Sequence, residues 1–181
     1  MKTVAVLLAE GFEEVEAVTA IDFLRRAGIR VVVAGINGID IKGSHDIVVA
    51  ADMRANKLTA DLDGVVIPGG MPGAKNISVS DYAVNLIKKL YEKGMLIAAI
   101  CAAPAVVLEP TGILQGKKAT CYPGLEEKLN GVDFQESRVV VDGNIITSRA
   151  PGTAAEFAIA IIRYLVGEET AEKIRTGTLQ K

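Results

Sequence analysis

The sequence predicts a three-layer α/β sandwich, and three observations support that fold class. Short runs rich in β-branched residues alternate along the chain with longer segments of helical periodicity. The short runs are apolar on both faces, which is typical of parallel strands covered by helices on each side. The chain has 181 residues, 50% of them hydrophobic, with no internal linker or repeat. We therefore expect one domain, residues 1–181, built around one core.

Four apolar runs predict the parallel strands of this sheet: 3–9, 29–35, 64–70 and 95–100. Helical periodicity lies between them at 14–27 and 81–93, and it starts again near Pro104. Gly28 and Gly94 stand at the two helix ends, where glycine adopts a left-handed C-cap at little cost. This alternation of strand and helix is that of a mostly parallel sheet.

Three further segments complete the predicted secondary structure. The segment 39–50 has the pattern of a β-hairpin that turns near Gly43 and Ser44. A second hairpin is expected at 138–148, because an Asp-Gly pair separates two β-branched runs there. The segment 152–166 is helical in pattern and apolar almost all round, so we expect it to be buried against the sheet.

The composition argues against several classes of function. The formal net charge is -2, and basic residues form no stripe, so we expect no nucleic-acid partner. The longest apolar runs are strand-sized and the N-terminus lacks the pattern of a signal peptide, which predicts a cytoplasmic protein without membrane contact. Two cysteines in a spacing that fits no zinc pattern, and a single histidine, predict neither a disulfide framework nor a metal site.

Cys101 stands at the junction of a predicted strand and a predicted helix. Ligands bind at the carboxyl ends of parallel strands, so the thiol is expected to face a crevice. The small neighbours Ala102 and Ala103 suit a sharp strand-to-helix turn, and Pro104 suits a first helical turn. A helix start would stabilise the thiolate and lower the pKa of Cys101. The alternative is a buried cysteine that acts only as a small hydrophobic residue.

Three glutamates cluster at the start of the first predicted helix. Glu13 and Glu14 are explained as acids that complement the helix dipole. Glu16 differs, because steps of four and seven residues from it lead to Ala20 and Phe23 on the apolar face. A carboxyl on that face is expected to have a raised pKa and to share its proton with a partner at the same crevice.

Loops at the same edge of the sheet supply further candidates. The Gly-rich loop after the third strand would bring the N–H of Gly70 close to a reacting oxygen, with the N–H of Ala102 as a second donor. The alternative is that these glycines serve only the turn, since they tolerate positive φ. Arg149, in the loop before the last predicted helix, and Arg26, on the exposed face of the first, are candidate contacts for an anion.

Five motifs together resemble the ThiJ/PfpI superfamily, and within it the branch named for the parkinsonism-associated protein deglycase. They are LLAEGFEEVEAVTAIDFLRRAGI, VVIPGGMPGAKN, LIAAICAAPAVVL, KATCYPG and ITSRAPGTAAEFA, in the order and spacing of the family. The resemblance implies a flavodoxin-like fold, related to class I glutamine amidotransferases, in a homodimer without a cofactor. It also implies that Cys101 is the nucleophile, Glu16 the neighbouring acid, and the amides of Gly70 and Ala102 the oxyanion site.

The sequence departs from the family at its histidines. In the protease branch a histidine directly follows the nucleophile, whereas this chain has Ala102, which argues against a cysteine peptidase. Within the closer branch a histidine is common where this chain has Tyr122. His45 lies in the first hairpin, where the human relative carries an arginine facing the site. We therefore count Tyr122 and His45 as candidate substrate or anion contacts, not as a Cys-His pair with Cys101.

The resemblance implies a glyoxalase or deglycase that acts on small 2-oxoaldehydes such as methylglyoxal, or on their adducts. The alternative is a chaperone-like or redox-responsive dimer in which Cys101 is oxidised and Glu16 hydrogen-bonds the oxidised sulfur. Both functions need the same environment around the thiol, so the sequence does not separate them. Cys121 is expected to be structural, and the alternative for it is a resolving thiol that pairs with Cys101.

Overall fold

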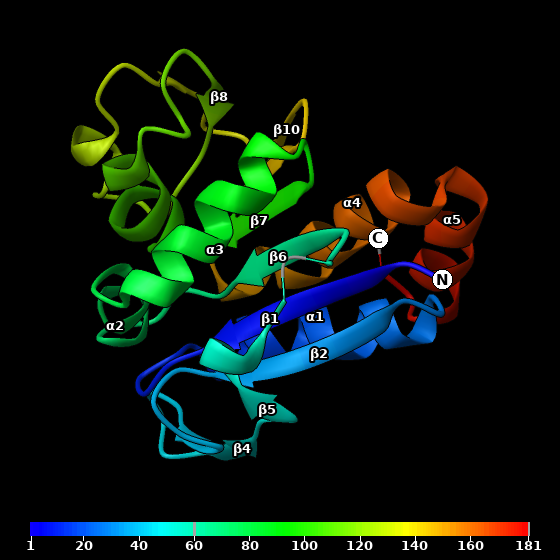
Figure 1. The fold of residues 1–181 in the computed structure, drawn as a ribbon. Coiled ribbons are helices and arrows are strands. Elements are labelled where there is room, and N and C mark those ends of the chain that lie inside the picture. The colour runs from blue at the N-terminus through cyan, green and yellow to red at the C-terminus, as the bar shows by residue number, and fades with distance from the viewer. Residues whose placement is uncertain (60, 181) are drawn as a thin grey trace.

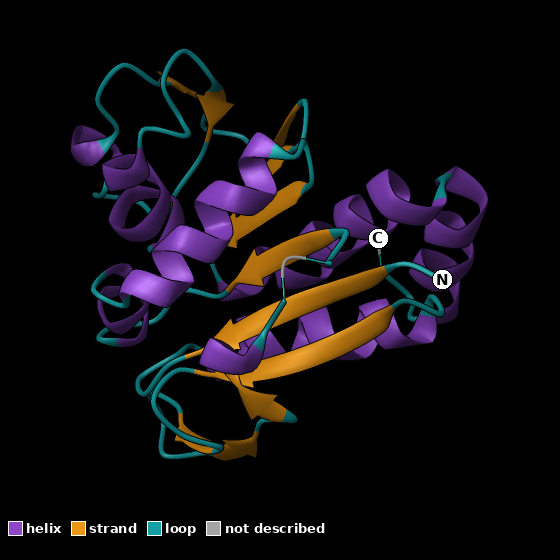
Figure 2. Ribbon diagram, viewed as in Figure 1, coloured by secondary structure: helices purple, strands orange, loops and turns teal. Residues whose placement is uncertain are grey.

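The computed structural model describes residues 1–59 and 61–180, and a seven-stranded sheet runs through its centre (Figures 1 and 2). The predicted domain, 1–181, includes residues 60 and 181, which lie outside the described residues. The strand order is β10-β11-β7-β6-β1-β2-β5. Neighbouring strands are parallel throughout, except for the antiparallel pair β10 and β11 at one edge. The strand bounds are Thr3–Leu8 (β1), Arg30–Gly35 (β2), Met53–Arg54 (β5), Gly64–Ile67 (β6), Leu96–Ile100 (β7), Val139–Asp142 (β10) and Ile145–Ser148 (β11).

Helices cover both faces of the sheet, which confirms the predicted fold class (Figure 2). On one face α1 (Glu14–Arg26) packs against α4 (Ala154–Val166), and α5 (Glu168–Gly177) packs against α4. The other face carries α3 (Asp81–Glu92), with α2 (Gly73–Ser78) beside it. Five short helical segments complete the set: Ala55–Lys57, Pro104–Leu108, Glu109–Thr111, Glu126–Lys128 and Pro151–Thr153. None of the helices in the described part of the chain has the length and apolar character that a bilayer span requires.

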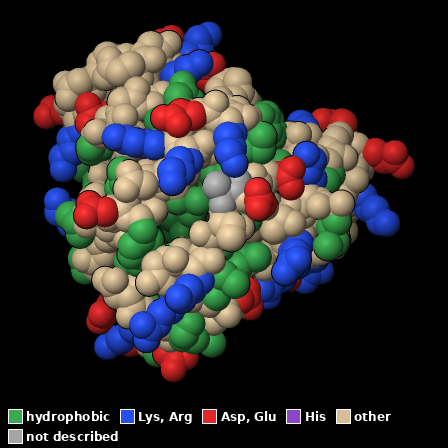
Figure 3. Space-filling model, viewed as in Figure 1, with side chains coloured by type: hydrophobic (Ala, Val, Ile, Leu, Met, Phe, Trp, Pro, Cys, Tyr) green, Lys and Arg blue, Asp and Glu red, His purple; other side chains and the backbone are tan. Residues whose placement is uncertain are grey.

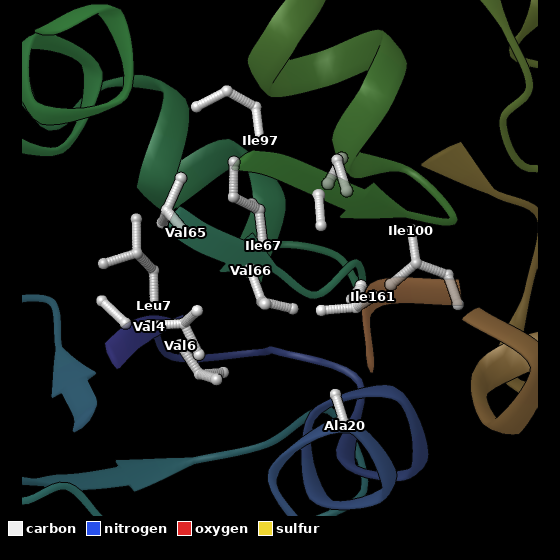
Figure 4. Close-up of a cluster of buried hydrophobic side chains, with 14 of the residues drawn as sticks. Val4, Val6, Leu7, Ala20, Val65, Val66, Ile67, Ile97, Ile100 and Ile161 are labelled. Atoms are coloured by element: carbon white, nitrogen blue, oxygen red, sulfur yellow. The ribbon is translucent and has the colours of Figure 1, made fainter. Parts of the chain in front are cut away.

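The central strands are apolar on both faces because helices cover both. Every residue of β6 and β7 is buried, and Figure 4 shows Val66, Ile67 and Ile97 within one continuous cluster. Ile161, on α4, is fully buried in the same core. Burial of each such side chain contributes about 1.5–3 kcal/mol of hydrophobic stabilisation. On the face shown in Figure 3, by contrast, Lys and Arg side chains are interspersed with Asp and Glu.

Two small pairs of strands lie outside the main sheet. The predicted hairpin at 39–50 forms as β3 (Asp40–Lys42) and β4 (Val48–Ala50), which pair antiparallel. The parallel pair β8 (Lys118–Ala119) and β9 (Asp133–Phe134) was not expected. The hairpin predicted at 138–148 is β10 and β11, but β11 also pairs in parallel with β7 and so extends the central sheet.

The parallel arrangement of β1, β6 and β7 brings their carboxyl ends to one edge of the sheet. The loops that leave these strands are 9–13, 68–72 and 101–103. Backbone hydrogen bonds join the first two, since the Glu13 N–H donates to the Gly69 oxygen and the Gly73 N–H to the Gly11 oxygen. Ligand sites of open α/β sheets lie at this edge, so the fold places the candidate residues where chemistry is expected.

Candidate active site

Cys101 occupies a strained turn directly after β7. Its φ is 63°, in the left-handed region that residues other than glycine rarely adopt. Such a conformation costs about 1–3 kcal/mol and persists only where the surroundings hold it. Two backbone hydrogen bonds do so here: the Cys101 N–H donates to Ser148, and the Tyr122 N–H donates to the Cys101 oxygen. The sharp turn expected from the small residues after Cys101 is therefore present.

Glu16 lies on the buried face of α1, next to this turn. Its side chain is fully buried, and the N–H of Gly69 donates to its Oε2 at 2.8 Å. Burial raises the pKa of Glu16 to about 7, against the lowering effect of hydrogen bonds with Gly69 and the Cys101 thiol. The second oxygen, Oε1, is buried and makes no regular hydrogen bond within the described part of the chain. The expected buried carboxyl with a raised pKa is confirmed.

The prediction of a lowered thiol pKa at Cys101 is wrong. Burial is the largest cause of a raised pKa, followed by the negative charge of Glu16 and the hydrogen bond between the two side chains. The backbone N–H groups of Gly70 and Ala102 act in the opposite direction. The helix that was expected to stabilise the thiolate is only the short segment Pro104–Leu108, so its dipole contributes little.

The thiol and the carboxyl therefore titrate as one unit. When this unit loses its first proton, the remaining proton lies either on the sulfur of Cys101 or on the carboxyl of Glu16. If Glu16 keeps it, the charge that raises the thiol pKa disappears, and only burial still opposes the thiolate. Loss of the first proton as the pH rises through about 7 therefore leaves one proton between the sulfur and the carboxyl.

Two glycines allow the loop after β6 to approach this pair. A Cβ on Gly69 would lie 2.6 Å from the Cβ of Cys101 and 2.8 Å from Oε2 of Glu16. Gly70 has a φ of 83°, and a Cβ there would lie 2.4 Å from the backbone nitrogen of Glu13. Glycine at 69 therefore allows the backbone to approach Cys101 and Glu16, and glycine at 70 allows the loop to pack on the backbone of residues 11–13. Sequence reasoning identified Gly70 as a donor but missed the bond from Gly69 to Glu16.

A cavity of about 470 Å³ opens over the sulfur. The side chain of Tyr122, whose residue is 45% exposed, stands at its wall. Its lining residues are Glu13, Gly70, Met71, Cys101, Ala102, Tyr122, Pro123, Gly124, Leu125 and Pro151. A larger groove of about 620 Å³ lies between β10 and α4, but neither cysteine lines it. The smaller cavity is therefore the candidate active site, since a cysteine thiol lies in its lining.

His45 lies beside the site but binds Glu14 instead of lining the cavity. Its Nδ1 is 2.8 Å from Glu14 Oε2, and its backbone N–H donates to Glu14 Oε1 at 2.6 Å. Burial raises the pKa of Glu14, but hydrogen bonds from His45 and Ser44 outweigh it and lower that pKa to about 2. The explanation of Glu14 by the helix dipole alone is thus wrong, because this carboxylate anchors the β3–β4 hairpin. Its burial was detectable, since Glu14 shares a helix face with Ala17 and Ile21, which are also buried.

One group in the described residues could offer three ligand atoms to a metal ion: Glu13, Glu14 and His45. These atoms all lie within 4.8 Å of one another. The hydrogen bond with Glu14 and the charges of both glutamates raise the pKa of His45. A protonated imidazole then supplies the positive charge that the two carboxylates need, so we interpret the group as a hydrogen-bonded ion cluster.

The structure does not bring the two arginine candidates to the cavity. Arg26 is exposed and pairs with Asp22 at 2.6 Å, about 15 Å along α1 from Glu16. Arg149 lies over the ring of Phe134, 6.0 Å from its centre, and 3.5 Å from a carboxylate oxygen of Glu136. Neither side chain lines the cavity within one chain.

Cys121 is buried and packs away from solvent. Its thiol donates to the Tyr122 oxygen at 3.5 Å, and burial raises its pKa to about 11. Both cysteines are free thiols. A protonated, buried thiol is a poor nucleophile, which favours the structural explanation of Cys121 over that of a resolving thiol.

Comparison with known proteins places this geometry in a family. The model of the DJ-1/PfpI family matches residues 2–164. The chain belongs to the DJ-1/PfpI family. A DJ-1 homolog A of Arabidopsis thaliana is 42% identical over 97% of this chain. Only 45% of that relative is covered, so this chain spans less than half of its length.

Two other DJ-1/PfpI relatives are covered almost completely. The structure named Toxoplasma gondii DJ-1, oxidized, superposes with a TM-score of 0.95 at 41% identity, over 99% of this chain and 98% of that one. A protein of Pyrococcus abyssi named a deglycase is 34% identical over 82% of this chain and 90% of its own length. The fold of the chain is thus that of DJ-1/PfpI proteins, with one relative named for a deglycase activity.

The raised pKa of Glu16 predicts a loss of stability as the pH rises. The native state keeps this proton up to about pH 7, whereas the unfolded chain releases it near pH 4.5, the ordinary pKa of a glutamate side chain. Unfolding free energy should therefore fall by about 3 kcal/mol from pH 4.5 to pH 8 on account of Glu16 alone. Urea unfolding across this range should show a fall in the free energy of unfolding that is about 3 kcal/mol larger in the wild type than in Glu16→Gln.

Glu92→Gln, on the exposed end of α3, is the matched control and should follow the wild-type pH dependence. The pKa of His45 is also raised, so its deprotonation lowers the stability of the protein as the pH rises. This contribution is the same in the wild type, Glu16→Gln and Glu92→Gln. Equal pH dependence in wild type and Glu16→Gln would show that the carboxyl is ionised in the native state already at pH 5.

Proposed function

We propose that this protein is a cofactor-independent enzyme of the glyoxalase or deglycase type, which acts on 2-oxoaldehydes or their adducts through Cys101. The supporting observation is the carboxyl of Glu16, with a pKa of about 7, against a thiol at the base of an open cavity. A nucleophile with a proton acceptor and donor beside it can both add to an aldehyde and rearrange the adduct. The deglycase name of the Pyrococcus abyssi relative points to the same substrate class.

The reaction begins with the addition of the Cys101 sulfur to the aldehyde carbon. The carboxyl of Glu16 gives its proton to the carbonyl oxygen, which becomes the hydroxyl of a hemithioacetal, and the sulfur loses its charge. The N–H groups of Gly70 and Ala102, which lie against the sulfur, are then in reach of the developing oxyanion. Both are backbone groups in a turn held by hydrogen bonds, so they need little reorganisation.

Glu16 then moves one proton between the two carbons of the substrate. Its carboxylate removes the proton from the former aldehyde carbon, and its carboxyl returns that proton to the former ketone carbon. The hydroxyl proton on the first carbon passes to the former ketone oxygen, so a thioester carbonyl and a new hydroxyl form together. The first carbon is oxidised and the second reduced, so no external oxidant or reductant takes part. The product is a thioester of Cys101, and water cleaves it to a 2-hydroxy acid and the free thiol.

A cysteine peptidase is disfavoured by the position of the histidine. Such a peptidase needs an imidazole to accept the thiol proton. The only histidine of the chain, His45, is bound to Glu14 and does not line the cavity over Cys101. The carboxyl of Glu16 serves as the proton acceptor in our proposal.

Methylglyoxal turnover tests this function directly. Wild type should convert it to lactate with a kcat/KM that rises with pH through about 7, because the pair must lose one proton first. Cys101→Ser should form no lactate above a protein-free control. Glu16→Gln, which keeps the shape but cannot carry the proton, should lower kcat/KM by about 10²- to 10⁴-fold. An enantiomer-specific lactate assay is the measurement.

Cys121→Ser is the control for a general effect of removing a thiol, and it should retain wild-type turnover. The proposal fails if wild type, Cys101→Ser and Glu16→Gln form equal amounts of lactate. The proposal also fails if the wild-type kcat/KM for methylglyoxal does not change between pH 5.5 and pH 8.5.

A second candidate function, redox sensing by Cys101, is supported by one observation. Oε1 of Glu16 is buried and lacks a regular hydrogen bond, so a protonated Glu16 has a donor free for an oxidised sulfur. Two equivalents of hydrogen peroxide would convert the thiolate to a sulfinate, with two oxygens added and water released. One solved DJ-1 relative carries the word oxidized in its description.

Exposure to hydrogen peroxide followed by intact-mass and peptide analysis tests this candidate. Wild type should gain two oxygens on Cys101. In Glu16→Gln the hydrogen bond from residue 16 to the oxidised sulfur is weakened, so Cys101 should carry markedly fewer oxygens or be oxidised further to the sulfonate with three. Cys121→Ser should behave as wild type. Oxidation spread over Cys121 and the methionines, with no preference for Cys101, would exclude a sensor role.

We also propose that the protein is a homodimer in the cytosol, as the family resemblance implies. Val15 and Val18 on α1 are 51% and 46% exposed, and Ile47 and Val48 on the adjoining hairpin are 56% and 57% exposed. Apolar side chains gathered next to the Glu14–His45 contact suit an interface between two copies. Two free thiols suit a reducing compartment.

Light scattering after size exclusion tests the dimer. Wild type should have twice the mass of one chain, and Val18→Lys should shift it toward the monomer. Val141→Lys is the control, because this residue is 54% exposed but lies on the edge strand β10. A wild-type monomer at micromolar concentration would contradict the proposal.

A further inference from the structure

The cavity over Cys101 is much larger than the smallest substrates of the proposed reaction. Its volume is about 470 Å³, within the range that is typical of sites for larger organic ligands. Methylglyoxal has the volume of only about four waters, so most of the cavity would stay hydrated around it. A substrate with a larger group on its ketone carbon would fill more of this space and displace that water.

The wall next to the sulfur is apolar. The side chains that form it are Met71, Tyr122, Pro123, Leu125 and Pro151. Residues 122–125 belong to one segment of the chain, and Met71 and Pro151 come from two other loops. Proline rings and the flat face of tyrosine offer rigid apolar surface that loses little entropy when a ligand binds. An aromatic ring is the substituent that such a wall binds best.

The charged side chain that lines the cavity is acidic. Glu13 is the only Asp, Glu, Lys or Arg among its lining residues, and its carboxylate receives a hydrogen bond from the Ser44 hydroxyl at 3.3 Å. His45 Nδ1 lies 3.6 Å away, behind Glu13 and outside the lining. Arg26 and Arg149 are paired elsewhere with Asp22 and Glu136. A substrate with a carboxylate or phosphate would meet a like charge and would find no basic partner in the cavity.

We propose that the preferred substrates are uncharged 2-oxoaldehydes with an aromatic substituent, and that Tyr122 determines this preference. The proposal rests on the function proposed above and names its substrate class. The aldehyde carbon reaches the sulfur of Cys101 while the aromatic ring lies against the wall that contains Tyr122. For phenylglyoxal the reaction adds one water, oxidises the aldehyde carbon, reduces the ketone carbon and yields mandelate.

The preference for an aromatic substituent is measured by comparing turnover of phenylglyoxal with turnover of methylglyoxal. The quantity is the ratio of kcat/KM for phenylglyoxal to that for methylglyoxal, compared between variants so that the intrinsic reactivity of the two aldehydes cancels. Tyr122→Ala should lower the ratio about 10-fold, because it removes the aromatic contact. Tyr122→Phe keeps the ring and should keep the ratio. Tyr122 is 45% exposed, so its removal leaves the buried core intact.

Tyr164→Ala is the matched control. Tyr164 is 42% exposed on α4, and it lines a different groove, with Lys2 and Asp63. This variant should have the ratio of the wild type. Circular dichroism and urea unfolding of all variants verify that each is folded.

The preference for uncharged substrates is tested with 4-carboxyphenylglyoxal, which carries a carboxylate on the ring of phenylglyoxal. The wild-type kcat/KM for 4-carboxyphenylglyoxal should be at least 10-fold lower than that for phenylglyoxal. In Glu13→Gln the difference between the two kcat/KM values should be smaller. Equal efficiency with both aryl substrates in the wild type would overturn the exclusion of anions.

The remaining outcomes separate the two proposals. A ratio that is unchanged in Tyr122→Ala would overturn the role of Tyr122 but leave the enzyme function in place. A wild-type kcat/KM that is higher for methylglyoxal than for phenylglyoxal would overturn the aromatic preference. No turnover of any aldehyde by a folded wild type would overturn the proposed function itself, and the substrate class with it.

Discussion

A carboxyl enclosed beside a thiol is the constraint on which the rest of the site depends. Ionisation of Glu16 inside the fold is unfavourable, and its only regular hydrogen bond in the described structure comes from the Gly69 N–H. That bond requires the loop after β6 to lie against α1 and against Cys101, which glycine at positions 69 and 70 permits. The proton affinity of the site is thus set by backbone packing as much as by the side chains themselves.

The sheet supplies the rigidity that this packing needs. Cys101 holds an unfavourable backbone conformation at the end of β7, a strand that is buried along its whole length and paired on both sides. Bonds to Ser148 and Tyr122 tie the turn to β11 and to the cavity wall. The strain is therefore balanced by the core of the domain, and the sulfur is held with its position fixed before any substrate binds.

Much of this could be predicted from the sequence, because burial imposes local patterns. Strands buried on both faces are uniformly apolar, and steps of four and seven residues place Glu16 on the inner face of α1. Other features depend on distant contacts. The pKa of Cys101 reflects burial and the charge of Glu16, and the pairing of β11 with β7 joins remote segments. The helix α5 buries only Ala171 and Ile174. The prediction of Arg26 as an anion contact used only its charge and its exposed position, and the structure places it far along α1, paired with Asp22.

The last strand at one side of the sheet, β5, spans only Met53–Arg54. A sheet edge exposes unpaired backbone groups that can template the strand of another molecule, and a two-residue edge offers almost none. The opposite edge is the β10–β11 hairpin, whose outer strand contacts β8. Addition of strands from other molecules is thus disfavoured at both edges of the central sheet, which opposes aggregation through the sheet.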